Sequence, residues 1–123
     1  MPAIPTPAAH HATPQSARAL ELHPAVLKFR DAARQQFADR LERIILYGSR
    51  ARCDHRPDSD YDIAIFVRDL DNPYTEYAAL AALAGQILAE HDIEINARLH
   101  PAAAWRASSA PLHRHIRQDG IEL

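Results

Sequence analysis

Cysteine, glycine and long apolar runs are scarce in this chain of 123 residues. Its single cysteine, Cys53, excludes an internal disulfide and a zinc site built from several cysteines. Apolar runs such as Ile44–Tyr47 are far shorter than the roughly 18 residues that a membrane-spanning helix needs. No basic start followed by an apolar stretch marks a secretory signal. We therefore expect a protein of the reducing cytoplasm that makes no use of a membrane.

Neither sign of charge dominates, because 14 basic residues stand against 16 acidic ones and the net charge is -2. A protein that coats nucleic acid needs a basic excess, so we find no strong nucleic-acid signal. The length and the 47% hydrophobic content suit one ordinary domain with a core of its own. Residues 1–18 contain four prolines and no periodic apolar face, which predicts a disordered leader before a single domain over 19–123.

The spacing of apolar residues predicts an α/β (α+β) fold, with a small mixed β-sheet and helices packed on one face. Repeats of three and four residues indicate amphipathic helices, whereas short β-branched or alternating segments indicate strands. The pair Asn72–Pro73 is typical of a helix start. In chain order, the expected elements are a helix over 25–41, strands over 43–47 and 59–67, a helix over 73–90, a strand over 92–99, and short helices over 102–107 and 112–119.

A Gly-Ser pair follows the first expected strand. Gly48 and Ser49 open a short expected helix, where backbone N–H groups and the serine hydroxyl can face an anion. The pair predicts a phosphate-binding corner, and an ordinary turn is the alternative. Arg50 and Arg52 come next in the chain. They can neutralise phosphate oxygens as bidentate donors, or they can be solvated residues of an arginine-rich loop.

Two acidic residues, Asp60 and Asp62, are two positions apart in the second expected strand. Strand alternation puts both carboxylates on one face, with Tyr61 on the opposite, apolar face. Carboxylates so placed can share divalent cations, and two metals about 3.5–4 Å apart are a common device for displacement at phosphorus. A solvated strand edge is the alternative. The apolar neighbours favour the metal site, because unpaired acids in a central strand are costly.

The segment from Gly48 to Asp62 resembles the nucleotidyltransferases of the DNA polymerase beta superfamily. Their hallmark is a strand, a Gly-Ser turn and an Asp-x-Asp pair on the next strand. The ten intervening residues are similar to the spacing in minimal nucleotidyltransferases (MNT), short members often paired with a HEPN-domain toxin. The resemblance covers roughly residues 25–123. It implies a polymerase-beta-like fold with helices on one face of the sheet.

The same resemblance implies a set of ligands. It places the phosphates of ATP on Gly48 and Ser49, and Mg²⁺, with two ions expected, on Asp60 and Asp62. A third acid from the next strand completes the family's metal site and activates the attacking hydroxyl. Glu94 is the candidate and Asp92 the alternative.

Two positions depart from the family pattern. The family usually has aspartate where this chain has Glu94, and many relatives have glycine where it has Cys53.

The function implied by the resemblance is transfer of AMP from ATP to a hydroxyl. The chain has no room for a domain that binds a large acceptor, so we expect the acceptor to be bound by another protein or to be one. MNT similarity makes a tyrosine of a cognate HEPN toxin the leading acceptor, and the chain would act as an antitoxin. A non-catalytic antitoxin that neutralises its toxin by binding alone is the alternative. Transfer to small antibiotics would need a second domain.

Overall fold

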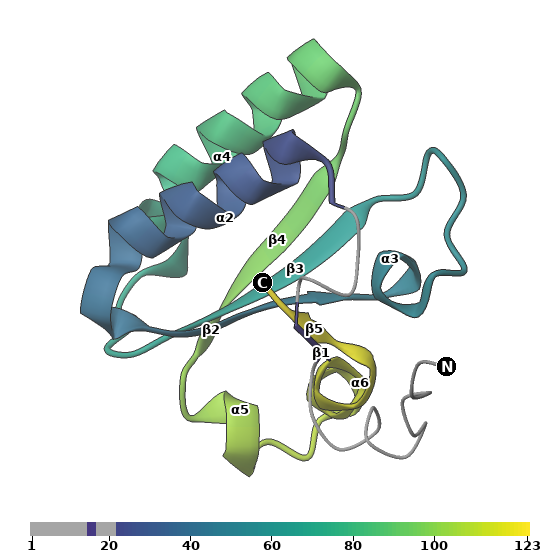
Figure 1. Ribbon diagram of the computed structural model, residues 1–123. Coiled ribbons are helices and arrows are strands. Elements are labelled where there is room, and N and C mark those ends of the chain that lie inside the picture. The colour runs from purple at the N-terminus through teal and green to yellow at the C-terminus, as the bar shows by residue number, and fades with distance from the viewer. Residues whose placement is uncertain (1–14, 17–21) are drawn as a thin grey trace, which may run out of the picture.

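A computed structural model describes residues 15–16 and 22–123 of the chain (Figure 1). The fold is a five-stranded mixed sheet in the order β1-β5-β2-β3-β4, which confirms the predicted α/β class. The strands are β1 Gln15–Ser16, β2 Leu41–Tyr47, β3 Tyr61–Val67, β4 Ile95–Pro101 and β5 Ile121–Glu122. The helices are α2 Pro24–Phe37, the 3-10 helix η2 Ala38–Arg40, α3 Ser49–Arg52, α4 Pro73–His91, α5 Ala104–Ala107 and α6 Pro111–Asp119.

Two long helices, α2 and α4, cover one face of the sheet (Figure 1). Between them and the sheet lies the larger core, which includes Phe29, Ile63, Ile65 and Leu80. The expectation of helices packed on one face is confirmed by these two helices. On the opposite face, Ile116 of α6 packs with the buried residues Ile45, Ala64 and Phe66. Central strands β2 and β3 carry apolar side chains on both faces, so both faces need a cover.

Element boundaries differ from the prediction at several ends. Helix α2 ends at Phe37, where Ala38 takes a positive φ of 50°, so Leu41 belongs to β2 and not to the helix. Strands β3 and β4 begin two and three residues later than predicted, and Asp60 and Glu94 directly precede them. The cap at Asn72 is confirmed, because its side chain accepts hydrogen bonds from the next helical N–H groups.

The predicted disordered leader, residues 1–18, lies outside the described residues except at Gln15–Ser16. Those two residues form β1, which pairs in parallel with β5. Neither β1 nor β5 was predicted, because a two-residue strand carries no periodic signal. In the described part of the chain, none of the helices has the length and apolar character needed to span a membrane.

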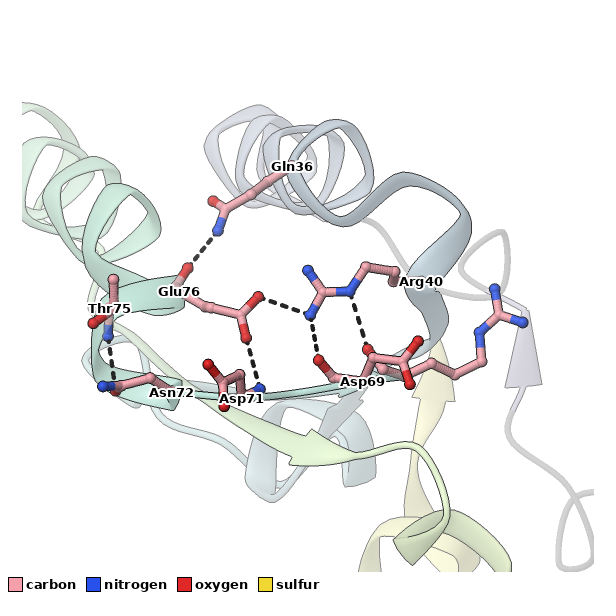
Figure 2. Close-up of polar contacts among 8 residues, drawn as sticks. Gln36, Arg40, Asp69, Asp71, Asn72, Thr75 and Glu76 are labelled. Carbon is pink, nitrogen blue, oxygen red and sulfur yellow. Dashed lines mark hydrogen bonds and ion pairs between the residues drawn. The ribbon is translucent and has the colours of Figure 1, made fainter.

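Arg40, just before β2, ties the end of α2 to the turn between β3 and α4 (Figure 2). Its guanidinium donates to the carbonyls of Arg68 and Asp69, at 3.1 and 3.0 Å, and pairs with the Glu76 carboxylate at 2.8 Å. The second carboxylate oxygen of Glu76 accepts from the N–H of Asp71 at 3.0 Å. That hydrogen bond, and then Arg40, lower the pKa of Glu76. The network holds the far end of the sheet, away from the Gly-Ser turn.

An imidazole pair lies on the α6 face of the sheet. His113 Nε2 and His100 Nδ1 are 3.2 Å apart, and the ring of His100 stacks on Phe66 with centroids 5.1 Å apart. Trp105 closes the cluster with an edge-on contact to Phe66. The outer nitrogens of both histidines are buried and have no hydrogen-bond partner in the described part of the chain. Burial first, and then the nearby His113 and Arg98, lower the pKa of His100 to about 4.

This pKa predicts a loss of stability in weak acid. Below about pH 6.5 the unfolded chain protonates His100, whereas the folded chain resists protonation down to about pH 4. Stability therefore falls between these values. If the His100 ring were fully buried, the free energy of unfolding would fall by about 2 kcal/mol between about pH 6.5 and pH 5. Because the ring is only half-buried, we expect a fall of about 1 kcal/mol. Urea unfolding at pH 7 and pH 5 should show that His100→Gln removes this part of the pH dependence.

The exposed His115 of α6 provides the matched control. His115→Gln should leave the wild-type pH dependence intact. An unchanged pH dependence in His100→Gln would contradict the assignment.

Candidate active site

Gly48 places the end of β2 directly against the Asp62 side chain. Its φ is +76°, a conformation that favours glycine, and a Cβ here would lie 2.4 Å from Asp62 Oδ2. Antiparallel pairing of β2 with β3 sets Tyr47 opposite Asp62, which brings the two strand ends together. Helix α3 starts at the next residue, Ser49. Helix α3 therefore begins one residue after the glycine that contacts the carboxylate.

Asp62 lies on the face opposite α2 and α4, because Tyr61 and Ile63 belong to the core beneath those helices. Its carboxylate is partly buried and accepts a hydrogen bond from Asn96 Nδ2 at 3.1 Å. Burial first raises the pKa of Asp62, and the charge of Asp60 raises it further, while the Asn96 hydrogen bond lowers it. The folded chain thus holds a carboxylate that a bound cation would stabilise. The alternation of residues in the strand did not predict that Asn96 contacts Asp62.

Glu94 reaches the same region from the neighbouring strand. The N–H of Tyr61 donates to the carbonyl of Glu94 at 2.9 Å, and Tyr61 is paired with Ile95. Asp60 directly precedes Tyr61, and Glu94 directly precedes Ile95. The two acids are therefore at matching positions on neighbouring strands and point to the same face of the sheet. Asp92 is the C-cap of α4, with a positive φ of 56°. The register favours Glu94 over Asp92 as the third acid.

A polar pocket of about 400 Å³ opens beside Glu94, between the loop before β3 and the turn from α4 to β4. Acidic and basic side chains line it together, so it can receive a polar group next to Glu94, whereas Asp60 and Asp62 are not among its lining residues. Its lining residues are Arg50, Pro57, Asp58, Ser59, Leu88, Asp92, Ile93 and Glu94.

Arg50 fastens α3 to the loop that leads into β3. Its guanidinium donates to the carbonyls of Ser59, at 3.0 and 3.2 Å, and of Pro57, at 3.1 Å. It also lies over the Tyr61 ring, with its central carbon 4.2 Å from the ring centroid. These contacts hold the chain on both sides of Asp60. Arg50 thus stabilises the loop before β3, a role that its position next to Ser49 in the sequence did not indicate.

Arg52 and Cys53 end the short helix α3. Arg52 is exposed and pairs with Asp54 at 3.1 Å, so its guanidinium can turn toward a ligand only by leaving that pair. Cys53 is exposed and takes the left-handed conformation, with a φ of 63°. That conformation favours glycine, which gives a physical reason for the glycine of the family pattern.

The residue types at the site suit Mg²⁺. Magnesium prefers carboxylate oxygens and is usually held by one or two of them, with water and substrate phosphates completing its shell. Asp60 and Asp62 can supply the two carboxylates. Within residues 15–16 and 22–123, no three acidic, histidine or cysteine side chains are gathered closely enough to hold a metal together. The donor set therefore fits a metal that binds with a nucleotide, and Glu94 would have to move to join it.

Comparison with known proteins identifies the family. Residues 31–121 match the family described as Polymerase beta, Nucleotidyltransferase. Among curated proteins, one from Methanocaldococcus jannaschii, named "Putative protein adenylyltransferase", is 30% identical over 100 residues. The match covers 80% of this chain and 94% of that protein.

Solved structures share the fold. A toxin-antitoxin crystal structure with AMP-PNP superposes with a TM-score of 0.52 at 23% identity, over 77% of this chain and 69% of that one. A mutant of the toxin-antitoxin MntA-HpeT, in which two aspartates two positions apart are glutamate, superposes with a TM-score of 0.51 at 21% identity. This second match also covers 77% of this chain and 69% of the other.

Removal of the Asp62 charge should stabilise the chain when no divalent cation is present. The pKa of Asp62 is raised in the folded state, so its ionised form opposes folding at neutral pH. Asp62→Asn keeps an oxygen that can accept from Asn96, and urea unfolding in EDTA at pH 7 should show a higher free energy of unfolding. The gain should shrink as the pH falls and the wild-type carboxyl is protonated.

Asp39→Asn, at an exposed residue of η2, is the control and should show no such gain. A less stable Asp62→Asn at pH 7 would contradict the account of the buried charge.

Proposed function

Because the chain belongs to the Polymerase beta, Nucleotidyltransferase family, we propose that it transfers AMP from ATP to a tyrosine hydroxyl of a cognate HEPN-family toxin and acts in the cytoplasm as its antitoxin. The observation that carries the proposal is the contact between the Gly-Ser turn and the Asp62 carboxylate. A phosphate chain on the turn would lie beside the carboxylates that hold its metal. This is the arrangement that displacement at phosphorus requires.

The acceptor class is supported by the relatives. One is named for adenylylation of proteins, and the solved structures are toxin-antitoxin assemblies, one of them with an ATP analogue. The pocket beside Glu94 is open on the surface, so a side chain of another protein can enter it. A partner protein therefore fits the site better than a small acceptor that needs a closed cavity.

In the proposed reaction, Gly48 and Ser49 hold the phosphates through backbone N–H groups and the serine hydroxyl. Asp60 and Asp62 would bind Mg²⁺, which when present neutralises charge on the phosphates. The acceptor oxygen forms a bond to the α-phosphorus, the bond to the β-phosphate oxygen breaks, and pyrophosphate leaves. Glu94 takes the hydroxyl proton or orients the hydroxyl. Arg50 keeps Asp60 in place through the loop it binds, and Arg52 can contact the phosphates.

A non-catalytic antitoxin is the second candidate. Two points favour it: the resemblance implies aspartate where this chain has Glu94, and in the described residues the third acid is not gathered with the other two. Such a chain would bind its toxin without transferring AMP.

Transfer of label from ATP decides between the two candidates. Purified chain, its partner toxin, Mg²⁺ and ATP labelled at the α-phosphate should add the mass of one AMP to a toxin tyrosine. Glu94→Gln keeps the shape of the side chain but cannot accept a proton, so transfer should fall by about 10²–10⁴-fold while nucleotide still binds. Asp60→Asn should abolish transfer.

Glu90→Gln, in the exposed last turn of α4, is the matched control and should transfer normally. If the wild-type chain neutralises the toxin without transferring label to it, the chain is a binding-only antitoxin and the proposed enzyme is wrong. Full activity in Glu94→Gln, with loss in Asp92→Asn, would assign the third acid to Asp92.

A further inference from the structure

Strand β4 forms an edge of the sheet, and none of residues 15–16 and 22–123 pairs with its outer side. The Glu94 carbonyl faces β3, where it accepts from Tyr61. Backbone groups alternate along a strand, so those of Ile95, Ala97 and Leu99 point outward. Edge strands are usually protected by proline, lysine or a bulge. Strand β4 has no lysine, has proline only at its last residue, Pro101, and pairs with β3 in an unbroken register, so its edge from Ile95 to Leu99 is open to another strand.

An apolar groove of about 540 Å³ runs beside this edge, between α4 and β4. Tyr74 and Tyr77 line it from α4, and Ala97 and Leu99 line it from β4. Tyr74 is 90% exposed, which is unusual for a large aromatic side chain next to an apolar groove. Apolar surface next to an unpaired strand edge is typical of a contact with another protein.

The charged side chains along β4 can pair with those of a second β4 that runs in the opposite direction. On the face opposite α4, Glu94, Asn96 and Arg98 follow one another, and all three are exposed. In an antiparallel pair centred on Asn96, Glu94 lies opposite Arg98 and Ile95 lies opposite Ala97 in the second strand. Glu94 and Arg98 make no ion pair within the described part of the chain, so both are available for this contact.

We propose that the chain forms a two-fold symmetric dimer in which β4 pairs antiparallel with β4 of a second copy, centred on Asn96. The pairing joins two sheets into one, and Ile95 and Ala97 exchange hydrogen bonds across the axis through their outward backbone groups. A centre at Arg98 would set two arginines opposite each other. A centre at Ala97 would leave Arg98 opposite an uncharged asparagine. The register at Asn96 alone matches each of these charges with its opposite.

The dimer has a consequence for the pocket beside Glu94. Arg98 of the partner subunit lies next to Glu94, so each copy contributes a basic residue to the edge of the other's pocket. The α4 helices lie on the same side of the joined sheets, and the groove at Tyr74 is covered in part. The inference depends on the strand edge and its charges, and it stands whether or not the chain transfers AMP.

Sedimentation equilibrium on the full chain tests the dimer. Wild type should have twice the 13.8 kDa mass of one chain at micromolar concentration. Arg98→Glu sets two acids opposite each other and should raise the dissociation constant at least about tenfold. Glu94→Arg combined with Arg98→Glu restores opposite charges in exchanged positions and should recover the dimer. This rescue separates a direct contact from a general loss of structure.

Ala97→Pro is a second, independent variant. It removes an outward N–H and leaves the hydrogen bonds to β3, because proline is tolerated where the N–H faces solvent. It should therefore be a folded monomer, with its circular dichroism unchanged. Lys28→Glu, on the exposed surface of α2, makes the same charge change as Arg98→Glu and should remain a dimer.

A wild type that sediments as a monomer at about 100 µM, well above the dissociation constants of stable dimers, would overturn the proposal. The proposal would also be overturned if the β4 edge binds only an extended segment of another protein, or if the dimer persists in both Arg98→Glu and Ala97→Pro.

Discussion

The contact between Gly48 and the Asp62 carboxylate is the constraint on which the site depends. Strands β2 and β3 pair closely enough there that no Cβ fits at position 48. The same closeness brings the start of α3 and the carboxylate into one corner, where a phosphate and its metal can be held together. It has a cost, because Asp62 is partly removed from water next to another acid and its pKa rises. The fold therefore tolerates an unfavourable ionised carboxylate at Asp62, a position where a bound cation would stabilise it.

Other contacts keep that corner in shape. Asn96 donates to Asp62 from β4, and Arg50 binds the loop that delivers Asp60 to the sheet. Neither residue needs to touch a ligand to matter, because each limits how far the acids can move. The two long helices stabilise the sheet from the opposite face, so the site face stays open around the acids. Glu94 is placed by the pairing of Tyr61 with Ile95, one strand away from Asp60.

Much of this arrangement follows from local patterns in the sequence. Strand alternation is enough to assign Asp62 and Tyr61 to opposite faces, and Asn72 followed by Pro73 is enough to start α4. The sequence could not indicate that Arg50 binds the Ser59 carbonyl or that Asn96 donates to Asp62, since both contacts depend on the register between segments. The strand β5 and the burial of Phe66 under α6 were missed for the same reason. A two-residue strand is defined by its neighbours and carries no pattern of its own.

Calorimetric titration with AMP-PNP, an ATP analogue that resists cleavage, tests the role of the Gly48–Asp62 corner most directly. The account predicts that the wild-type chain binds the analogue with Mg²⁺ and at least about tenfold more weakly in EDTA, since carboxylates hold phosphates only through a cation. It also predicts that Gly48→Ala, if folded by circular dichroism, loses the Mg²⁺-dependent binding. Equal affinity with Mg²⁺ and with EDTA, or wild-type binding by folded Gly48→Ala, would contradict it.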